Sequence, residues 1–302
     1  MELAIIGLGR MGGNMAERLL RAGHRVVPYA RRPEALERFT RLGADGVTAF
    51  PALMQRVSPP RVVWMMIPAG DAVDQTIQTL IPLLDAGDVV VDGGNSFYGD
   101  TIRRAALLRE HGLHYVDVGT SGGIWGLTEG YSMMVGGERD IVGRVRPILE
   151  TLAPAPDRGW GHVGPHGAGH FVKMVHNGIE YGMMQAMAEG FTIMKRKAEF
   201  GLDLHQIAEI WRFGSVVRSW LLDLTASALT KDQELADVRP YVQDSGEGRW
   251  TVKEAIDLDV TAPVITISLL QRFASRDAYG YADRLLALMR EQFGGHEVKR
   301  DA

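Results

Sequence analysis

The first half of the chain alternates short apolar runs with amphipathic stretches. Runs such as the valines at 89–91 are typical of strands covered on both faces of a sheet, and the stretches between such runs repeat apolar residues with a helical period. Strands that alternate with helices predict βαβ units and a mainly parallel, doubly wound sheet. The expected strands are residues 3–6, 25–29, 61–66, 89–92, 115–118 and 132–135, with helices such as 11–21, 72–84 and 100–110 between them.

The pattern changes after about residue 163, and from Ala168 onward helical periods replace strand patterns. The first expected helix, residues 170–197, is unusually long for a globular protein. Further helices are expected over residues 204–212, 216–226, 252–258, 264–275 and 281–293. We therefore predict an α/β domain over residues 1–163 and an all-helical domain over residues 164–302.

A glycine motif lies between the first expected strand and the first expected helix. Gly7 permits a tight turn, Gly9 lets the backbone approach a pyrophosphate, and Gly12 lets the helix pack on the strand. The helix N-terminus adds N–H groups and a partial positive charge that favour phosphate. A glycine-rich turn in another α/β protein is the alternative, but the position of the motif favours a Rossmann-like domain that binds a dinucleotide.

The end of the second strand bears on which dinucleotide is bound. An Asp or Glu there would bind the ribose hydroxyl of NAD, but the chain has Ala30, Arg31 and Arg32 and no acid until Glu34. An arginine at this position can pair with the 2′-phosphate of NADP and stack on adenine. Two solvated arginines at a strand end are the alternative, and we predict NADP as the first choice and NAD as the second.

Four polar residues form a stripe on the long helix. Lys173, His176, Asn177 and Glu180 have the spacing of one helix face among apolar neighbours, so we expect a helix buried on most sides with the stripe facing a cleft or a polar layer. A structural Lys173–Glu180 pair is the alternative, although buried ion pairs stabilise poorly. Burial lowers the pKa of a lysine and raises that of a glutamate, which suits a base and an acid roughly 10 Å apart along a helix.

Two loops that follow expected strands complete the candidate site. Asn95 follows residues 89–92, and Ser121, Gly122 and Gly123 follow residues 115–118. Ligands bind at the carboxyl ends of strands in open α/β sheets, and these loops offer hydrogen bonds to a hydroxyl or a carboxylate. Each of these two loops alone is equally compatible with a tight turn. Together with the glycine motif, however, they make three loops at one sheet edge, which indicates a binding site.

Composition and charge narrow the classes of function. The net charge of −4 and the scattered Lys and Arg disfavour nucleic-acid binding. No apolar run reaches the roughly 18 residues that span a bilayer, and the first residues read as a strand rather than as a signal peptide. The chain has no cysteine, which excludes disulfides, thiolate nucleophiles and thiolate metal sites, and which is compatible with a cytoplasmic location.

With these residues laid out, the sequence resembles the decarboxylating 6-phosphogluconate dehydrogenases, in particular their short-chain form. The resemblance covers the whole chain and is most specific over residues 167–181, which read GAGHFVKMVHNGIEY. The other matching stretches are residues 7–12 (GLGRMG), 92–96 (DGGNS), 121–123 (SGG), 245–251 (SGEGRWT) and 290–296 (REQFGGH).

The resemblance implies an oxidoreductase of gluconate metabolism and the pentose phosphate pathway. It would convert 6-phosphogluconate to ribulose 5-phosphate and carbon dioxide with NADP or NAD and without a metal. Lys173 is implied as the base that takes the C3 hydroxyl proton and then stabilises the enolate, Glu180 as the acid that protonates C1, and Asn177 as a further catalytic residue. The implied substrate contacts are Asn95, Ser121, Gly122, Gly123, His176, Tyr181, Arg272, Arg290 and His296. The implied cofactor contacts are Gly7, Leu8, Gly9, Arg10, Met11, Gly12, Ala30, Arg31, Arg32, Ile67, Pro68, Ala69 and Asn95.

The resemblance also bears on assembly and on phosphate binding. In the family, the residues that match Arg290 and His296 reach the substrate from a neighbouring subunit, which implies a homodimer or a dimer of dimers. Arg272 resembles the phosphate-binding arginine, and such local cations suit a trianionic substrate on a negatively charged protein. Ser245 and Glu247 replace a lysine and a threonine of the long-chain members, which removes one phosphate contact.

Residues expected near the dinucleotide depart from the family motif, and they leave both NADP and NAD possible as the cofactor. Ala30 stands where the family motif that reads NADP has an asparagine, although Arg31 keeps its arginine. Residues 67–69 replace a Val-Lys-Ala near the nicotinamide. Short-chain relatives often prefer NAD, whereas the arginine favours NADP.

Two other functions remain open. A 3-hydroxyacid dehydrogenase of the same superfamily, for example one acting on 3-hydroxyisobutyrate, would share the glycine motif and a catalytic lysine but not a phosphorylated substrate. Arg290 with His296 and the pair His176 and Asn177 argue against it. A non-catalytic dinucleotide sensor would keep the glycine motif and would have no need of Lys173 and Glu180 on one stripe.

Overall fold

The computed structural model describes residues 1–295 and 297–300. The chain folds into two compact units, Met1–Asn177 and Gly178–Ala302, and the division falls inside helix α8 (Ala168–Arg196). The predicted domain ranges, residues 1–163 and 164–302, place the division before this helix and stay a prediction.

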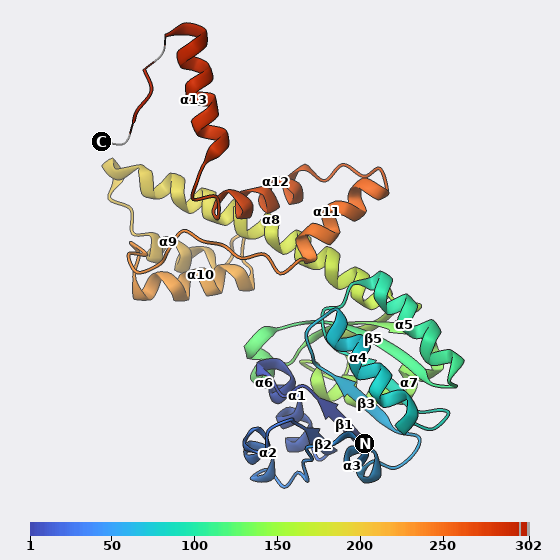
Figure 1. The fold of residues 1–302 in the computed structure, drawn as a ribbon. Helices are drawn as coiled ribbons and strands as arrows, with labels where there is room; N and C mark the ends of the chain where they lie inside the picture. Colours follow the sequence, from blue (N-terminus) through green and yellow to red (C-terminus); the bar gives the residue numbers. More distant parts are fainter. Residues whose placement is uncertain (296, 301–302) are drawn as a thin grey trace. The chain divides into compact units, whose positions relative to one another are not determined.

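The first unit is built on a seven-stranded sheet with the order β2-β1-β3-β4-β5-β6-β7 (Figure 1). Neighbouring strands are parallel except β5 and β6, so the predicted mainly parallel sheet is confirmed. The sequence pattern did not predict β7, because its residues WGHVG contain no apolar run. The strands are β1 (Glu2–Ile6), β2 (Arg25–Tyr29), β3 (Val62–Met65), β4 (Val89–Asp92), β5 (His114–Ser121), β6 (Ser132–Gly137) and β7 (Trp160–Gly164).

Helices cover both faces of this sheet and bury a separate core on each face (Figure 1). Successive residues of β1 alternate between the cores, because Leu3 and Ile5 pack with residues of α1 and α7, whereas Ala4 and Ile6 pack with residues of α3, α4 and α5. The predicted doubly wound architecture is thereby confirmed. The helices are α1 (Arg10–Arg21), α2 (Glu37–Thr40), α3 (Phe50–Arg56), α4 (Asp71–Leu80), α5 (Tyr98–Glu110), α6 (Gly126–Glu129) and α7 (Arg139–Leu152), with 3₁₀ turns η1 (Pro33–Leu36), η2 (Ile81–Leu83) and η3 (Gly123–Trp125).

The second unit contains only helices and loops in its described residues, as predicted (Figure 1). The helix expected from residue 216 begins at Trp220, because the Ser219 side chain accepts a hydrogen bond from the Leu222 N–H and caps it there. The helix expected from residue 252 begins at Glu247, where glycines on either side obscure the helical period. No described helix combines the length and hydropathy that a membrane span requires. After α8 come η4 (Ala198–Phe200), α9 (Leu204–Trp211), α10 (Trp220–Lys231), α11 (Glu247–Asp257), α12 (Pro263–Ala274) and α13 (Tyr281–Gly294).

Helix α8 is less buried than predicted. Ile179 is 52% exposed, and Met183 and Met184 are each 41% exposed. The prediction that this helix is buried on most sides is therefore wrong for the single chain. The physical reason is that the core of the second unit is too small to reach these faces. That core consists of Leu204, Ala208, Leu222, Ala226 and Leu229, with Met187, Phe191 and Met194 of α8 packed against it.

Candidate active site

The junction between β1 and α1 shows why its motif has glycine at three positions. Gly7 has a φ of +94°, and a Cβ on it would collide with the Met66 carbonyl just after β3. A Cβ on Gly12 would collide with the Gly7 carbonyl, whereas a Cβ on Gly9 would meet no described atom within 4 Å. Open space therefore lies in front of the N-terminus of α1. That space, bordered by helix N–H groups, fits the pyrophosphate of a nicotinamide dinucleotide.

The same junction forms one wall of a cleft of about 930 Å³ in the first unit. Tyr29 and Phe50 form another wall with stacked rings whose centroids are 4.2 Å apart, and the sequence analysis missed both residues. Their aromatic character was the signal available, since a flat apolar wall at the end of β2 suits a purine ring. The predicted cofactor residues that line the cleft are Gly7, Leu8, Gly9, Ala30, Arg31, Arg32, Ile67 and Pro68. Arg10, Met11, Gly12, Ala69 and Asn95 are not part of its lining.

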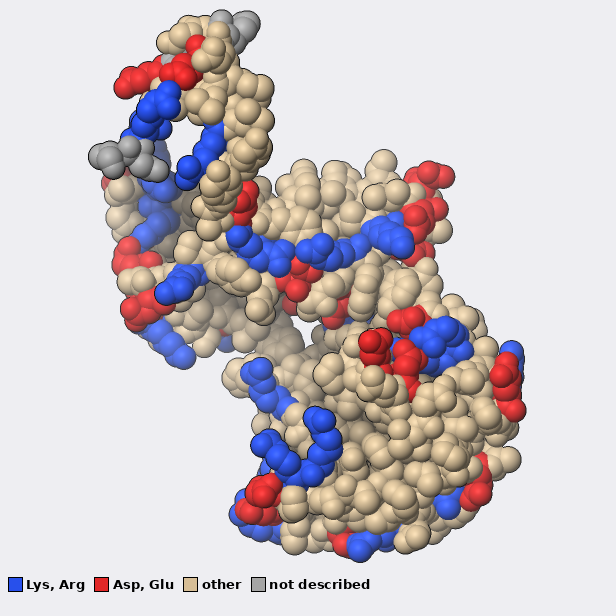
Figure 2. Space-filling view, viewed as in Figure 1, with Lys and Arg blue, Asp and Glu red and all other residues tan. Residues whose placement is uncertain are grey.

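The charge at the mouth of this cleft is positive. Arg31 and Arg32 are exposed on its rim, and Figure 2 shows Lys and Arg gathered over α1 and α2 on the visible face. No Asp or Glu occurs among the described residues that line the cleft. The cleft therefore favours an anionic ligand at the end of β2.

The polar stripe of α8 begins with a compact cluster. Lys173 is 4% exposed, and its Nζ donates a hydrogen bond to Oδ1 of Asn177 and lies 3.3 Å from Nδ1 of His176. That Nδ1 lies 3.0 Å from Oδ1 of Asn177. Residues three and four apart on a helix share a face, which is why the structure brings these three side chains together. The lysine amine is thus oriented by two neighbours on its own helix.

Close packing against β5 sets the position of this cluster. A Cβ on Gly119 of β5 would collide with the Cβ of Lys173. The buried carboxylate of Asp117, on the same strand, accepts hydrogen bonds from the N–H groups of Gly167 (2.9 Å) and His170 (3.0 Å) at the start of α8. A carboxylate at a helix N-terminus also interacts favourably with the helix dipole. The helix that carries the lysine is therefore anchored to the strand that carries the next candidate loop.

That loop follows β5 directly. Ser121 is the last residue of the strand, and Gly122 and Gly123 adopt φ values of +132° and +54°, which favour glycine. Ser121 and Gly122 are half-buried and Gly123 is exposed. The loop therefore begins at the carboxyl end of β5.

Asn95 lies in the loop after β4, which pairs in parallel with β5. It is half-buried between Gly94 and Ser96. The Gly94 N–H and the Ser96 hydroxyl both donate hydrogen bonds to the buried carboxylate of Asp92, at 3.1 and 2.7 Å. Because parallel strands end at the same sheet edge, the loops of Asn95 and Ser121 leave the sheet on one side.

A second polar cluster lies in the second unit. Tyr181 is 5% exposed, and its hydroxyl accepts a hydrogen bond from the Ser245 N–H (3.2 Å) and lies 3.4 Å from Ser245 Oγ. The Arg272 guanidinium stacks over the Tyr181 ring, 3.4 Å from its centroid, and donates to the Gln243 carbonyl at 2.8 Å. A guanidinium, hydroxyls and a backbone N–H together are groups that bind a phosphate monoester.

Asp244 supports this cluster and was missed by the sequence analysis. It is 4% exposed on its side chain, and its carboxylate accepts hydrogen bonds from Gly246 N–H (3.2 Å), Arg249 (3.0 Å) and Arg276 (2.9 Å). The hydrogen bond from Arg249, together with that from Arg276, holds the pKa of Asp244 below its ordinary value. The carboxylate thus holds the turn that presents Ser245, and its only sequence signal was its position next to that residue.

Two other predicted site residues lie on helices, and a third falls outside the described residues. Glu180 is half-buried on α8, two helical turns after Lys173. Arg290 is exposed on α13. His296 lies outside the described residues.

The whole chain is similar to 6-phosphogluconate dehydrogenases. The model for the NAD binding domain of 6-phosphogluconate dehydrogenase matches residues 2–163, and the model for the C-terminal domain of 6-phosphogluconate dehydrogenase matches residues 169–287. An NAD(+)-dependent, decarboxylating 6-phosphogluconate dehydrogenase of Haloferax volcanii is 43% identical over 99% of this chain and 99% of its own length.

Longer relatives match over part of their length. An NADP(+)-dependent, decarboxylating 6-phosphogluconate dehydrogenase of Bacillus subtilis is 38% identical over 91% of this chain and 61% of its own. The structure of Plasmodium falciparum 6-phosphogluconate dehydrogenase, described with NADP+ and with 6-phosphogluconate, has a TM-score of 0.84 and 30% identity, covering 100% of this chain and 66% of that one.

Proposed function

The chain belongs to the 6-phosphogluconate dehydrogenase family, and on that premise we propose that it oxidises and decarboxylates 6-phosphogluconate to ribulose 5-phosphate. One observation carries the proposal above the others. Lys173 is buried, its amine is bonded to Asn177 and lies beside His176, and its helix is anchored to the strand that ends at Ser121. A lysine held in this way has the orientation that a general base requires.

The chemistry assigns a step to each end of the polar stripe. Bound nicotinamide supplies the hydride acceptor. Lys173, in its neutral form, takes the proton of the C3 hydroxyl as the hydride leaves that carbon. The 3-keto acid then loses carbon dioxide, and the Lys173 ammonium stabilises the enolate that remains. Glu180 protonates C1 of the enediol, which gives ribulose 5-phosphate.

The other predicted residues bind and orient the substrate. Asn95, His176 and Asn177 offer hydrogen bonds to its hydroxyls, and the loop of Ser121, Gly122 and Gly123 offers them to its carboxylate and hydroxyls. Tyr181, Ser245 and Arg272 form the phosphate site, which their mutual contacts support. The Ser245 N–H and hydroxyl act there in place of the lysine of the long-chain members.

We propose NADP as the preferred cofactor. Arg31 and Arg32 are exposed on the rim of the dinucleotide cleft, and no acidic residue lines the described part of that cleft. A guanidinium at the end of β2 binds a 2′-phosphate, whereas a ribose hydroxyl is normally bound there by a carboxylate. NAD is the alternative, because the Haloferax relative is named as NAD(+)-dependent.

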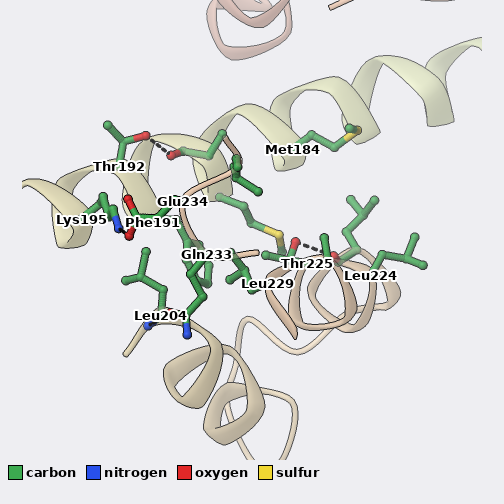
Figure 3. Close-up of a pocket in the computed structure, with 15 residues that line it drawn as sticks. Met184, Phe191, Thr192, Lys195, Leu204, Leu224, Thr225, Leu229, Gln233 and Glu234 are labelled. Carbon is green, nitrogen blue, oxygen red and sulfur yellow. Dashed lines mark hydrogen bonds and ion pairs between the residues drawn. The ribbon is translucent and has the colours of Figure 1, made fainter. Parts of the chain in front are cut away.

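We propose that the enzyme is a homodimer. The second unit exposes apolar side chains on α12 and α13, among them Leu270 (52%), Leu286 (53%) and Met289 (49%). An apolar groove of about 520 Å³ lies among α8, α9 and α10, and Figure 3 shows Met184 and Leu224 on its wall. Exposed apolar surface of this extent marks an interface, and a second copy of the chain would cover it. The neighbour would then supply Arg290 and His296 to the substrate.

Initial rates with matched substrates test the function. We expect turnover of 6-phosphogluconate, and a fall in kcat/KM of ~10²-fold or more for gluconate, which lacks the phosphate that Arg272 binds. Faster oxidation of 3-hydroxyisobutyrate than of 6-phosphogluconate would establish the hydroxyacid dehydrogenase instead. Tight dinucleotide binding without turnover of any of these substrates would establish the sensor.

A further inference from the structure

The loop of Asn95 is held by a buried network that the mechanism has not used. Asp92 is fully buried, and its carboxylate binds the residues on both sides of Asn95 through the Gly94 N–H and the Ser96 hydroxyl. Its Oδ2 also accepts a hydrogen bond from the Tyr115 hydroxyl at 2.9 Å. Burial raises the pKa of Tyr115, so that hydroxyl stays protonated and remains a donor.

Arg104 of α5 connects this loop to a second one. Its side chain is fully buried, and Nη1 donates to Ser96 Oγ at 3.3 Å. Its Nη2 donates to the Gly70 carbonyl at 3.1 Å, directly after the cofactor loop of residues 67–69. Asp74 of α4 accepts two further hydrogen bonds, from Nε and Nη2 at 2.9 and 3.0 Å. The hydrogen bond from Arg104 lowers the pKa of Asp74, so the pair stays ionised at neutral pH.

The hydrogen bonds of Arg104 to two different loops are not explained by fold stability alone. Burial of the Arg104 guanidinium costs desolvation, and its ion-pair partner Asp74 is 32% exposed on its side chain, so the pair adds little net stability to the fold. The guanidinium has a rigid, planar set of donors, and here each side of it is bound to a different loop. The pairing of Met65 with Asp92 brings the cofactor loop and the Asn95 loop together, and the Arg104 side chain adds a rigid bridge between them.

A second buried arginine offers an internal comparison. Arg61 precedes β3, and its side chain binds Asp88, Asp85 and the carbonyls of Met54 and Val57. Its side chain is 12% exposed and pairs with the fully buried Asp88 at the amino ends of the strands, whereas the Asp74 carboxylate bound by Arg104 is 32% exposed. Both arginines thus bind carboxylates and backbone carbonyls. Arg104 lies at the carboxyl ends of the strands, whereas Arg61 lies at their amino ends.

We propose that Arg104 and Asp92 are positioning residues, which together hold the Asn95 side chain at a fixed distance from the 67–70 loop and so align the substrate with the nicotinamide. The proposal rests on the proposed function. Neither residue touches the reacting atoms, and both act through Asn95 and the cofactor loop. A misplacement of about 1 Å at a hydride-transfer site can cost about 10²-fold in rate.

The test compares Arg104→Lys with the matched control Arg61→Lys in the full-length protein. Each change keeps the charge and removes the planar donor set. We expect Arg104→Lys to lower kcat for 6-phosphogluconate by ~10- to 100-fold, with the dissociation constant of NADP nearly unchanged. We also expect a larger deuterium isotope effect on kcat with substrate deuterated at C3, because hydride transfer becomes slower than product release. Arg61→Lys should lower the melting temperature and leave kcat and the isotope effect at wild-type values.

A milder variant keeps the test decisive if Arg104→Lys does not fold. Ser96→Ala removes only the hydroxyl shared by Asp92 and Arg104, and it should lower kcat several-fold and raise the isotope effect in the same direction. The proposal would be overturned if Ser96→Ala, and Arg104→Lys where it folds, had the wild-type kcat and isotope effect, even if their melting temperatures fell. An inactive wild-type enzyme in the same assay would instead contradict the proposed function.

Discussion

The two units of the chain differ in how far their apolar side chains are buried. In the first unit, β4 is buried along its whole length and large side chains such as Trp64 and Met15 are fully buried. In the second unit, Phe213 is 75% exposed, Val264 is 66% exposed and Ile193 is 71% exposed. The first unit therefore completes its own core within one chain, and the second does not. The sheet of the first unit therefore positions Lys173 within one chain, whereas in the proposed homodimer a second copy would cover the apolar faces of the helical unit.

The sharpest test of this comparison is Lys173→Met, in the unit that positions the chemistry. We expect kcat to fall by ~10³-fold, because a thioether cannot take or return the proton. NADP affinity should stay at the wild-type value, since Lys173 does not line the dinucleotide cleft. Initial rates and a fluorescence titration with reduced cofactor measure the two quantities. Lys195→Met, an exposed lysine on the same helix, is the control, and wild-type turnover by Lys173→Met would remove this residue from the mechanism.

The next effect concerns the open surface of the second unit. Leu286→Asp should weaken the dimer by about 2 kcal/mol or more, because a charge at a buried apolar contact is desolvated. Sedimentation across a concentration series measures this change. Ile102→Asp alters a side chain of similar exposure, 50% against 53%, on α5 of the first unit and should leave the assembly intact. A wild-type protein that sediments as a monomer at all concentrations would refute the homodimer.

A smaller effect is expected where the first unit packs α8 on β5. Gly119→Ala puts a Cβ against the Cβ of Lys173, so the helix must shift. We expect the free energy of unfolding to fall by about 1–3 kcal/mol and kcat to fall by about tenfold. Gly161→Ala in β7, where a Cβ meets no described atom within 4 Å, is the matched control. Equal effects of the two changes on kcat would show that the Gly119 contact does not position the lysine.

The smallest predicted effect is on cofactor choice. Arg31→Ala should raise the KM for NADP by about tenfold and leave the KM for NAD nearly unchanged, because only NADP carries the phosphate that the guanidinium would bind. Initial rates at saturating 6-phosphogluconate measure both constants. Arg41→Ala, an exposed arginine that does not line the cleft, serves as the control. Equal losses for the two dinucleotides would mean that Arg31 does not meet the 2′-phosphate.

Local patterns in the sequence were sufficient for much of the first unit. The valines of β4, the turn at Gly7 and the helical spacing of Lys173, His176 and Asn177 each depend on neighbours a few residues away. The contact of Gly119 with Lys173 could not be predicted in this way, because only the fold brings strand β5 against α8. The same holds for the binding of Arg104 to both loops.

The helical unit shows a different limit. The apolar pattern of α8 predicted a helix buried on most sides, and it carried no information on whether the same chain or a second copy would bury those faces. Ile179 and Met183 are consequently exposed in the single chain. A hydrophobic period shows that burial of a helix face is favourable. It does not show whether residues of the same chain or of a second copy bury that face.

The ratio of carbon dioxide to reduced cofactor tests the central claim most directly. Wild-type enzyme would be incubated with limiting 6-phosphogluconate labelled at C1 and with excess NADP, and both products would be followed to completion. Oxidation at C3 followed by loss of C1 predicts equal amounts of labelled carbon dioxide and reduced cofactor, with ribulose 5-phosphate as the remaining product. Reduced cofactor without labelled carbon dioxide, or with the label retained in a sugar acid, would contradict it.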